Sequence, residues 1–237
     1  MLESTITVNN ILYTNVNRIG SGACSEVYSA FSSSTKQKVA IKKYKKGKPA
    51  KALVGGGLNH YGSLRDVSET VFHEIRDINN RYKLLMKFID RGKINNSWVL
   101  IVEYIEGEIL SEYFSKNISQ SHKLINASKC LGQMLKKWHN SEFAHGDPHL
   151  DNVLIKKMSN GKCFLKLIDY NMIHHPTFQY CRRYCCFDRT SATNRYAEDL
   201  QNNSEIVGNG FLHDISDFDR DHNLNGTLLK AFEEGYC

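Results

Sequence analysis

The segment His145-Gly146-Asp147-Pro148-His149-Leu150-Asp151-Asn152 carries the strongest structural signal in this chain, and Asp169 follows Asn152 by 17 residues at the end of a hydrophobic run. Between them, residues 153–158 and 162–168 have the character of two strands joined at an Asn-Gly turn, which is a strong hairpin signal. Such a hairpin brings Asn152 and Asp169 to the same open end, where an amide oxygen and a carboxylate can share Mg²⁺. Asp147 lies just upstream and is placed to accept a proton from a hydroxyl group.

A second motif lies near the N-terminus, in the segment Arg18-Ile19-Gly20-Ser21-Gly22-Ala23-Cys24-Ser25-Glu26-Val27-Tyr28. Its small residues join two strand-like runs and let backbone N–H groups approach phosphate oxygens closely. The strand Val39-Ala40-Ile41-Lys42 follows, and its lysine stands 22 residues after Gly20. This order predicts a phosphate-binding loop followed by a lysine that contacts the same phosphates.

With these motifs the chain resembles the protein kinase superfamily. The resemblance implies ATP and Mg²⁺ as cofactors and assigns a role to each matching residue. Asp147 is then the catalytic base, Lys42 the α/β-phosphate lysine, and Asn152 and Asp169 the metal ligands. The expected nucleotide-binding residues in the first half of the chain are Gly20, Ser21, Gly22, Val27, Ala40 and Lys42.

The lysine of a kinase pairs with a glutamate, and two glutamates are available. Asp66-Val67-Ser68-Glu69 resembles a capping box, which gives Glu69 a structural role. Glu74 lies on the same helical stripe as Val67 and Val71, and a carboxylate on an apolar face needs a charged partner. We therefore expect Glu74 to pair with Lys42, the alternative being a glutamate on the helix surface.

The segment Ser97–Gly107 is a strand that runs into an acidic connection and resembles the kinase hinge. By that resemblance Val102 lines the back of the adenine pocket, and backbone groups of Glu103 to Ile105 bind the adenine edge. An ordinary core strand explains Val99–Val102 equally well.

The predicted fold class is α+β, a two-lobed protein-kinase-like fold with a β-rich N-lobe, residues 1–106, and a reduced, mainly helical C-lobe, residues 107–237. About five strands and one helix are expected before the boundary. In the second part, apolar residues of 121–140 recur at Leu124, Leu131, Leu135 and Trp138, which predicts a core-facing helix.

Several positions depart from the kinase pattern. Ser25 replaces the third loop glycine, His149 stands where Ser/Thr kinases have lysine, and Tyr170-Asn171 replaces Phe-Gly after Asp169. The catalytic loop is more similar to those of aminoglycoside and choline phosphotransferases and of ABC1-type kinases. We expect transfer of phosphate from Mg-ATP to a protein Ser or Thr, with His149 contributing a hydrogen bond but no fixed charge. A small-molecule phosphotransferase and a pseudokinase that binds a partner are the alternatives.

Composition and charge are those of an ordinary globular protein: 237 residues, 41% hydrophobic and 24% charged, with a net charge of +6. Without an apolar stretch of membrane-spanning length, and with seven cysteines of irregular spacing, an intracellular location is expected, in a host cell if the chain is an injected or viral kinase. Lysines crowd residues 43–51, as in a solvated loop or a surface for an anionic partner, whereas specific nucleic-acid binding is not expected. A cluster of His and Cys at 174–186 suggests zinc, but its spacing does not favour a structural site.

Overall fold

The structure is a computed structural model that describes residues 4–22, 25–45, 83, 86–139, 149–157, 163–168 and 211–237. The chain forms two compact units, Met1–Ile105 and Glu106–Cys237. The predicted boundary after residue 106 stands one residue beyond this division. Several residues of the sequence argument, among them Glu69, Glu74, Asp147 and Asp169, lie outside the described residues, as does the cluster at 174–186.

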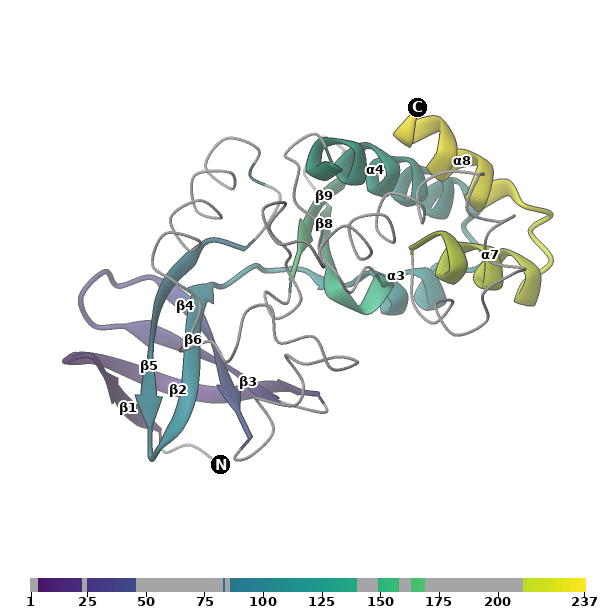
Figure 1. Ribbon diagram of the computed structural model, residues 1–237. Coiled ribbons are helices and arrows are strands. Elements are labelled where there is room, and N and C mark those ends of the chain that lie inside the picture. Colours follow the sequence, from purple (N-terminus) through teal and green to yellow (C-terminus); the bar gives the residue numbers. More distant parts are fainter. Residues whose placement is uncertain are drawn as a thin grey trace, which may run out of the picture. The chain divides into compact units, whose positions relative to one another are not determined.

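The described part of the first unit is one antiparallel sheet of six strands in the order β1-β2-β3-β4-β6-β5 (Figure 1). The sequence analysis expected about five strands here. Their bounds are β1 Thr5–Val8, β2 Ile11–Ser21, β3 Ser25–Ser32, β4 Lys38–Tyr44, β5 Phe88–Ile94 and β6 Ser97–Glu103.

Two Asn-Asn turns shape this sheet. Asn9-Asn10 joins β1 to β2 and Asn95-Asn96 joins β5 to β6, and all four residues have positive φ, which suits tight hairpins. The side-chain amide of Asn9 also donates to Asp90 Oδ2 at 3.0 Å and to the Arg91 carbonyl at 2.8 Å. The first hairpin is therefore tied to β5 across the sheet, so the sheet curls.

The concave side of the curled sheet encloses the core of the first unit. Tyr28, Ile41 and Ile101 are at most 2% exposed and belong to one cluster with residues from β1, β2 and β5. Where β1 approaches β5, a Cβ atom added to Gly92 would lie 2.4 Å from Val8 Cγ1. Glycine at position 92 is thus required by close packing.

The second unit combines a small sheet with helices (Figure 1). Strands β7 (Glu108–Ile109), β8 (Val153–Lys157) and β9 (Cys163–Leu167) are antiparallel neighbours in that order. A 3-10 turn, η2 (Leu150–Asn152), precedes β8. The α-helices are α3 Leu110–Lys116, α4 Ser121–His139, α7 Phe211–Asp221 and α8 Thr227–Tyr236.

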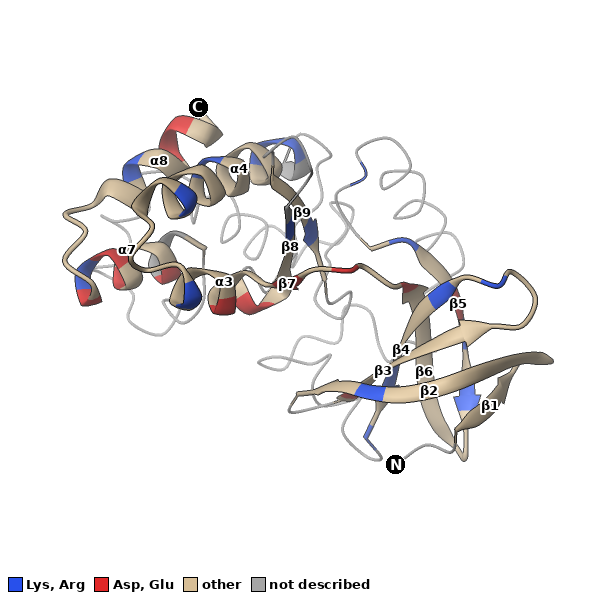
Figure 2. Ribbon diagram, turned by 180° about the vertical axis from the view of Figure 1, so that it is seen from behind, with Lys and Arg blue, Asp and Glu red and all other residues tan. Residues whose placement is uncertain are grey.

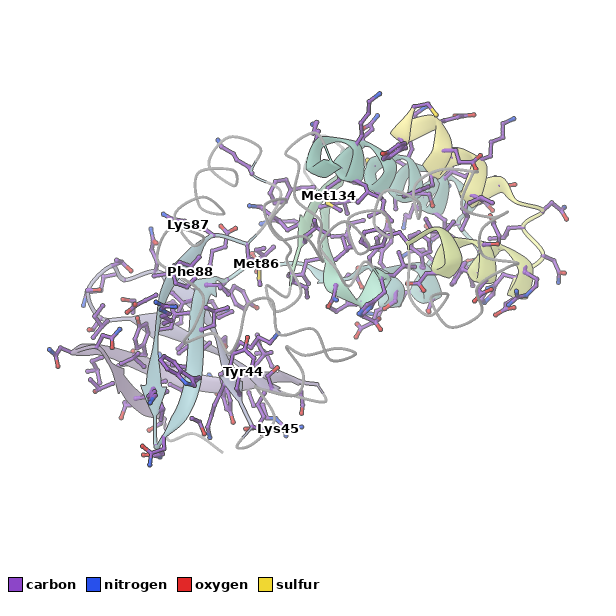
Figure 3. The ribbon with its side chains drawn as sticks, in the orientation of Figure 1. Tyr44, Lys45, Met86, Lys87, Phe88 and Met134 are labelled. Carbon is purple, nitrogen blue, oxygen red and sulfur yellow. The ribbon has the colours of Figure 1, made fainter. Side chains whose placement is uncertain are left out.

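The predicted helix over residues 121–140 is confirmed as α4. Leu124, Leu131 and Leu135 are fully buried, as the periodicity indicated, and Met134, marked on α4 in Figure 3, is 5% exposed. The side chain of Trp138 lies outside the described residues. The apolar stripe of α4 therefore faces the core of the second unit.

Helices α4 and α8 touch through their backbones. A Cβ atom on Gly132 would lie 2.1 Å from the Phe232 carbonyl oxygen, and one on Gly235 would lie 2.1 Å from the Lys129 carbonyl oxygen. Only glycine permits so close a helix crossing. Phe232, fully buried, fills the core beside this contact.

Candidate active site

The strand register of the first unit aligns the predicted nucleotide-binding residues. Gly20 of β2 is opposite Val27 of β3, and Val27 is opposite Lys42 of β4. Residues directly opposite each other project from the same face of a sheet. The loop glycine, the valine and the lysine thus share one row, although they come from three strands.

A second row lies one step along the same face. Ala40, two residues before Lys42, is opposite Val102 of β6. Because alternate residues of a strand share a face, Ala40 and Val102 lie on the face that carries Lys42. The intervening residues, among them Ile41 and Ile101, face the core cluster instead.

Lys42 is half-buried on this face. Its Nζ atom lies 5.6 Å from the centre of the Tyr44 ring, two residues further along β4. Figure 3 shows Tyr44 and Lys45 at the end of that strand. The predicted partner, Glu74, lies outside the described residues, so the ion pair stays a prediction.

The loop between β2 and β3 is held by two hydrogen bonds at Gly22. The Gly22 N–H donates to the Ser25 carbonyl at 2.9 Å, and Lys45 Nζ donates to the Gly22 carbonyl at 2.7 Å. Among the described residues, an added Cβ atom would meet nothing within 4 Å at Gly22 and only Val27 Cβ, at 3.8 Å, at Gly20. Packing against this part of the chain therefore does not require glycine at either position. Lys45 belongs to the lysine-rich segment 43–51, and at least this member of it has an intramolecular role.

The segment that resembles the hinge begins at the end of β6. Glu103 donates its backbone N–H to the Lys87 carbonyl at 2.8 Å, and its side chain accepts the Lys87 N–H at 2.8 Å. Beyond it, Lys38 Nζ lies 3.9 Å above the Tyr104 ring. Because the Glu103 N–H serves the sheet, an adenine base would use other backbone groups between Glu103 and Ile105.

The two strands predicted after Asn152 are confirmed in the second unit. Strands β8 and β9 pair antiparallel, with Val153 opposite Leu167. One step further out, the Ile168 N–H donates to the Asn152 carbonyl at 2.8 Å. Asn152 and the residue that precedes Asp169 therefore lie at the same end of the strand pair.

His149 and Asn152 are in direct contact at that end. Asn152 is 7% exposed, and its Nδ2 atom lies 2.9 Å from His149 Nε2. Since an amide nitrogen can only donate, Nε2 is the acceptor in this contact when the proton of the neutral ring is on Nδ1. Asn152 Oδ1 is the atom of that side chain with the chemistry to ligate a cation.

Two anchors of this segment were missed by the sequence analysis. Asp214 of α7 accepts the backbone N–H of Leu150 at 2.8 Å, and Asp151 accepts a hydrogen bond from the Ser111 hydroxyl of α3. Asp214 lies 64 residues from Leu150, and no local pattern marks such a partner. Both carboxylates position the 3-10 turn that contains Asn152.

Acidic residues, red in Figure 2, follow one another where β7 runs into α3. Lysines neutralise them in part, since Lys116 Nζ lies 2.9 Å from Glu108 and 3.3 Å from Glu112, and Lys156 Nζ lies 3.9 Å from Glu106. These pairs are solvent-exposed and contribute little to stability. Within the part of the chain that the structure describes, no helix is both long and apolar enough to cross a membrane.

Comparison with known protein families shows which family this chain belongs to. The family described as protein kinase domain matches residues 13–196, which include every predicted site residue. This chain belongs to the protein kinase family. The predicted α+β kinase fold is confirmed, and the crystal structure of the PF14_0431 kinase domain superposes with a TM-score of 0.54 at 16% identity, covering 75% of this chain and 55% of that one.

Curated relatives of this kinase-family chain carry the name serine/threonine-protein kinase. The relative called pakA, from Dictyostelium discoideum, is 26% identical over 181 residues, which cover 71% of this chain and 13% of pakA. The relative called shk1/pak1, from Schizosaccharomyces pombe, is 27% identical over 172 residues, which cover 70% of this chain and 24% of the relative. The chain thus spans less than a quarter of the length of these relatives.

Proposed function

We propose that this chain is a protein kinase that transfers the γ-phosphate of Mg-ATP to a protein Ser or Thr hydroxyl. The observation that carries the proposal is the strand register, which puts Gly20, Val27 and Lys42 in one row. Relatives named serine/threonine-protein kinases support the choice of acceptor. An intracellular location stays a prediction.

The described residues of the first unit fit a nucleotide. Val27, Ala40 and Val102 supply an apolar surface for a base, and Lys42 on the same face supplies positive charge for phosphates. Among the described residues the space beside Gly20 and Gly22 is open, so phosphate oxygens can approach the loop backbone, where the Gly22 N–H itself serves the Ser25 carbonyl. Lys45 would hold the loop in place through the Gly22 carbonyl.

In the second unit we assign Asn152 and Asp169 as ligands of Mg²⁺, which when bound neutralises charge on the phosphates. The oxygen chemistry of both side chains fits this hard cation. Asp147 accepts the proton of the attacking hydroxyl. His149 orients Asn152 through its 2.9 Å contact and adds no positive charge, unlike a lysine at this position.

A small-molecule phosphotransferase is the second candidate. The observation that favours it is His149, in a segment that resembles the loops of aminoglycoside and choline phosphotransferases. A pseudokinase is less consistent with the sequence, because all the catalytic positions carry suitable residues.

The test of the assignment separates the base from the metal ligand. Asp147→Asn should lower transfer by about 100-fold or more while Mg-ATP affinity changes little, because a general base acts only on the acceptor. Asp169→Ala should weaken Mg²⁺-dependent nucleotide binding itself. Calorimetric titration of both variants measures the affinities, and equal loss of nucleotide binding in the two would contradict the assignment.

Incubation with ATP labelled on its γ-phosphate identifies the class of acceptor. The purified chain is incubated with a generic protein substrate, or with an aminoglycoside, choline or an inositol phosphate, and labelled products are resolved. Protein labelling on Ser or Thr that Asp147→Asn lacks supports the proposal. The exposed Ser34 and Thr35 are candidates for self-labelling. Turnover of a small molecule without protein labelling would establish the second candidate instead.

A further inference from the structure

Two cysteines of the second unit lie together outside the proposed active site. Cys130 is on α4 and Cys163 is the first residue of β9, 33 positions later in the sequence. Neither is in a disulfide and both are partly exposed, so small reagents can reach them. The kinase reaction proposed above uses neither residue.

Asn126, one turn before Cys130 on α4, contacts both sulfur atoms. Its Nδ2 atom donates to Cys163 Sγ at 3.5 Å, and Cys130 Sγ lies 3.9 Å from its Oδ1 atom. Hydrogen bonding from Cys163 outweighs the effect of burial and lowers the pKa of Cys130 to about 7. A lowered pKa favours the thiolate, which is the reactive form of cysteine.

We propose that Cys130 and Cys163 are a redox-active dithiol that closes to a disulfide between α4 and β9. The sulfur atoms of Cys163 and Cys130, from elements distant in the sequence, lie 3.5 and 3.9 Å from the amide atoms of the same Asn126 side chain. The shared contact with Asn126 keeps both sulfur atoms on the same side of α4.

The reaction balances with a low-molecular-weight disulfide such as oxidised glutathione. The Cys130 thiolate attacks one sulfur atom of the reagent, and one glutathione leaves as a thiolate. The Cys163 thiolate then attacks the Cys130 sulfur of this mixed disulfide, and the second glutathione leaves. The two protein thiols lose two protons and two electrons, and the reagent gains both electrons as two thiols.

The bond would connect two segments that lead toward proposed catalytic residues. Helix α4 precedes residues 145–152 in the sequence, and β9 precedes Asp169. Closing the disulfide would restrain both segments at once. A thiol reductant would reverse the restraint.

Peptide mapping by mass spectrometry tests the proposal on the full chain. The reduced protein is equilibrated at pH 7 with oxidised and reduced glutathione in varied ratio, quenched by acid and alkylation, and digested. We expect a cross-linked pair of peptides containing Cys130 and Cys163, with the loss of two hydrogen atoms. The link should form at a ratio that leaves Cys237, an exposed cysteine, reduced.

Single substitutions give the matched controls. In Cys163→Ser the reaction should stop after the first step, so that Cys130 carries one glutathione, whereas Cys237→Ser should keep the cross-link unchanged. Circular dichroism of each variant shows whether it is folded, and the wild-type mapping is decisive if a variant is not. Glutathione on both Cys130 and Cys163 of the wild-type chain without a cross-link would overturn the proposal, as would pairing of Cys130 or Cys163 with other cysteines instead.

Discussion

Gly22 is a residue whose identity the described part of the protein does not explain. Within that part, an added Cβ atom would have nothing within 4 Å, and the φ of Gly22 is not among the positive values. A glycine in an ordinary conformation with open space costs conformational entropy on folding and gains no packing. A glycine at this position is explained if a ligand approaches the backbone at this point.

Replacing Gly22 with alanine should therefore separate stability from nucleotide binding. We expect Gly22→Ala to change the free energy of unfolding by no more than about 0.5 kcal/mol. The methyl group should obstruct the phosphates and raise the Kd for Mg-ATP roughly tenfold, which corresponds to about 1.4 kcal/mol. Urea denaturation and calorimetric titration measure the two effects.

Gly92→Ala is the opposite case and serves as the control. Its Cβ atom would collide with Val8 at 2.4 Å, so stability should fall while the folded protein keeps its affinity for nucleotide. If Gly22→Ala instead destabilised the protein and left affinity unchanged, glycine would have a structural role in the loop.

Among the elements, α8 has an unusual start. Gly226, at its N-cap, has φ 73° and no side chain to cap the helix. Asp219 of α7 replaces the missing cap, because its two oxygens accept the N–H groups of Leu228 at 3.1 Å and Leu229 at 2.8 Å. Asp219 is 3% exposed, so these N–H groups have little access to water. One helix therefore caps the next.

We expect Asp219→Ala to lower the free energy of unfolding by about 1–2 kcal/mol, the usual effect of losing a helix cap. The negative charge at the helix N-terminus adds to this effect. Asp221→Ala is the matched control, since its carboxylate is exposed and pairs with Arg220 at 3.2 Å. Its effect should stay within about 0.5 kcal/mol. Similar urea midpoints for the two variants would show that Asp219 is not the cap.

At the level of the whole chain, the second unit extends past the region that matches the kinase family. The match ends at residue 196, whereas α7 and α8 occupy residues 211–236. These helices bury Phe211, Ile215, Leu228 and Phe232. Helix α8 crosses α4 in backbone contact, and Asp214 of α7 anchors Leu150.

A chain truncated after residue 210 should therefore lose the cooperative unfolding of its second unit, although all the proposed catalytic residues remain. Removing α8 exposes the apolar stripe of α4, and burying one large apolar side chain stabilises by about 1.5–3 kcal/mol. Scanning calorimetry of the truncated and full chains measures the change. Cys237→Ser, at the same terminus, should unfold as the full chain does. An unchanged transition after truncation would mean that α7 and α8 are accessory.

Local patterns in the sequence were sufficient for much of the fold. Helix α4 and the paired strands β8 and β9 formed where periodicity and the Asn-Gly signal predicted them, because helix faces and tight turns depend on residues close in sequence. The spacing from Gly20 to Lys42 likewise indicated the kinase family. Only the tertiary structure revealed the contacts of Asp214 with Leu150 and of Asn126 with Cys163. Such contacts join residues dozens of positions apart, and they depend on how elements pack, which leaves no periodic trace in either segment.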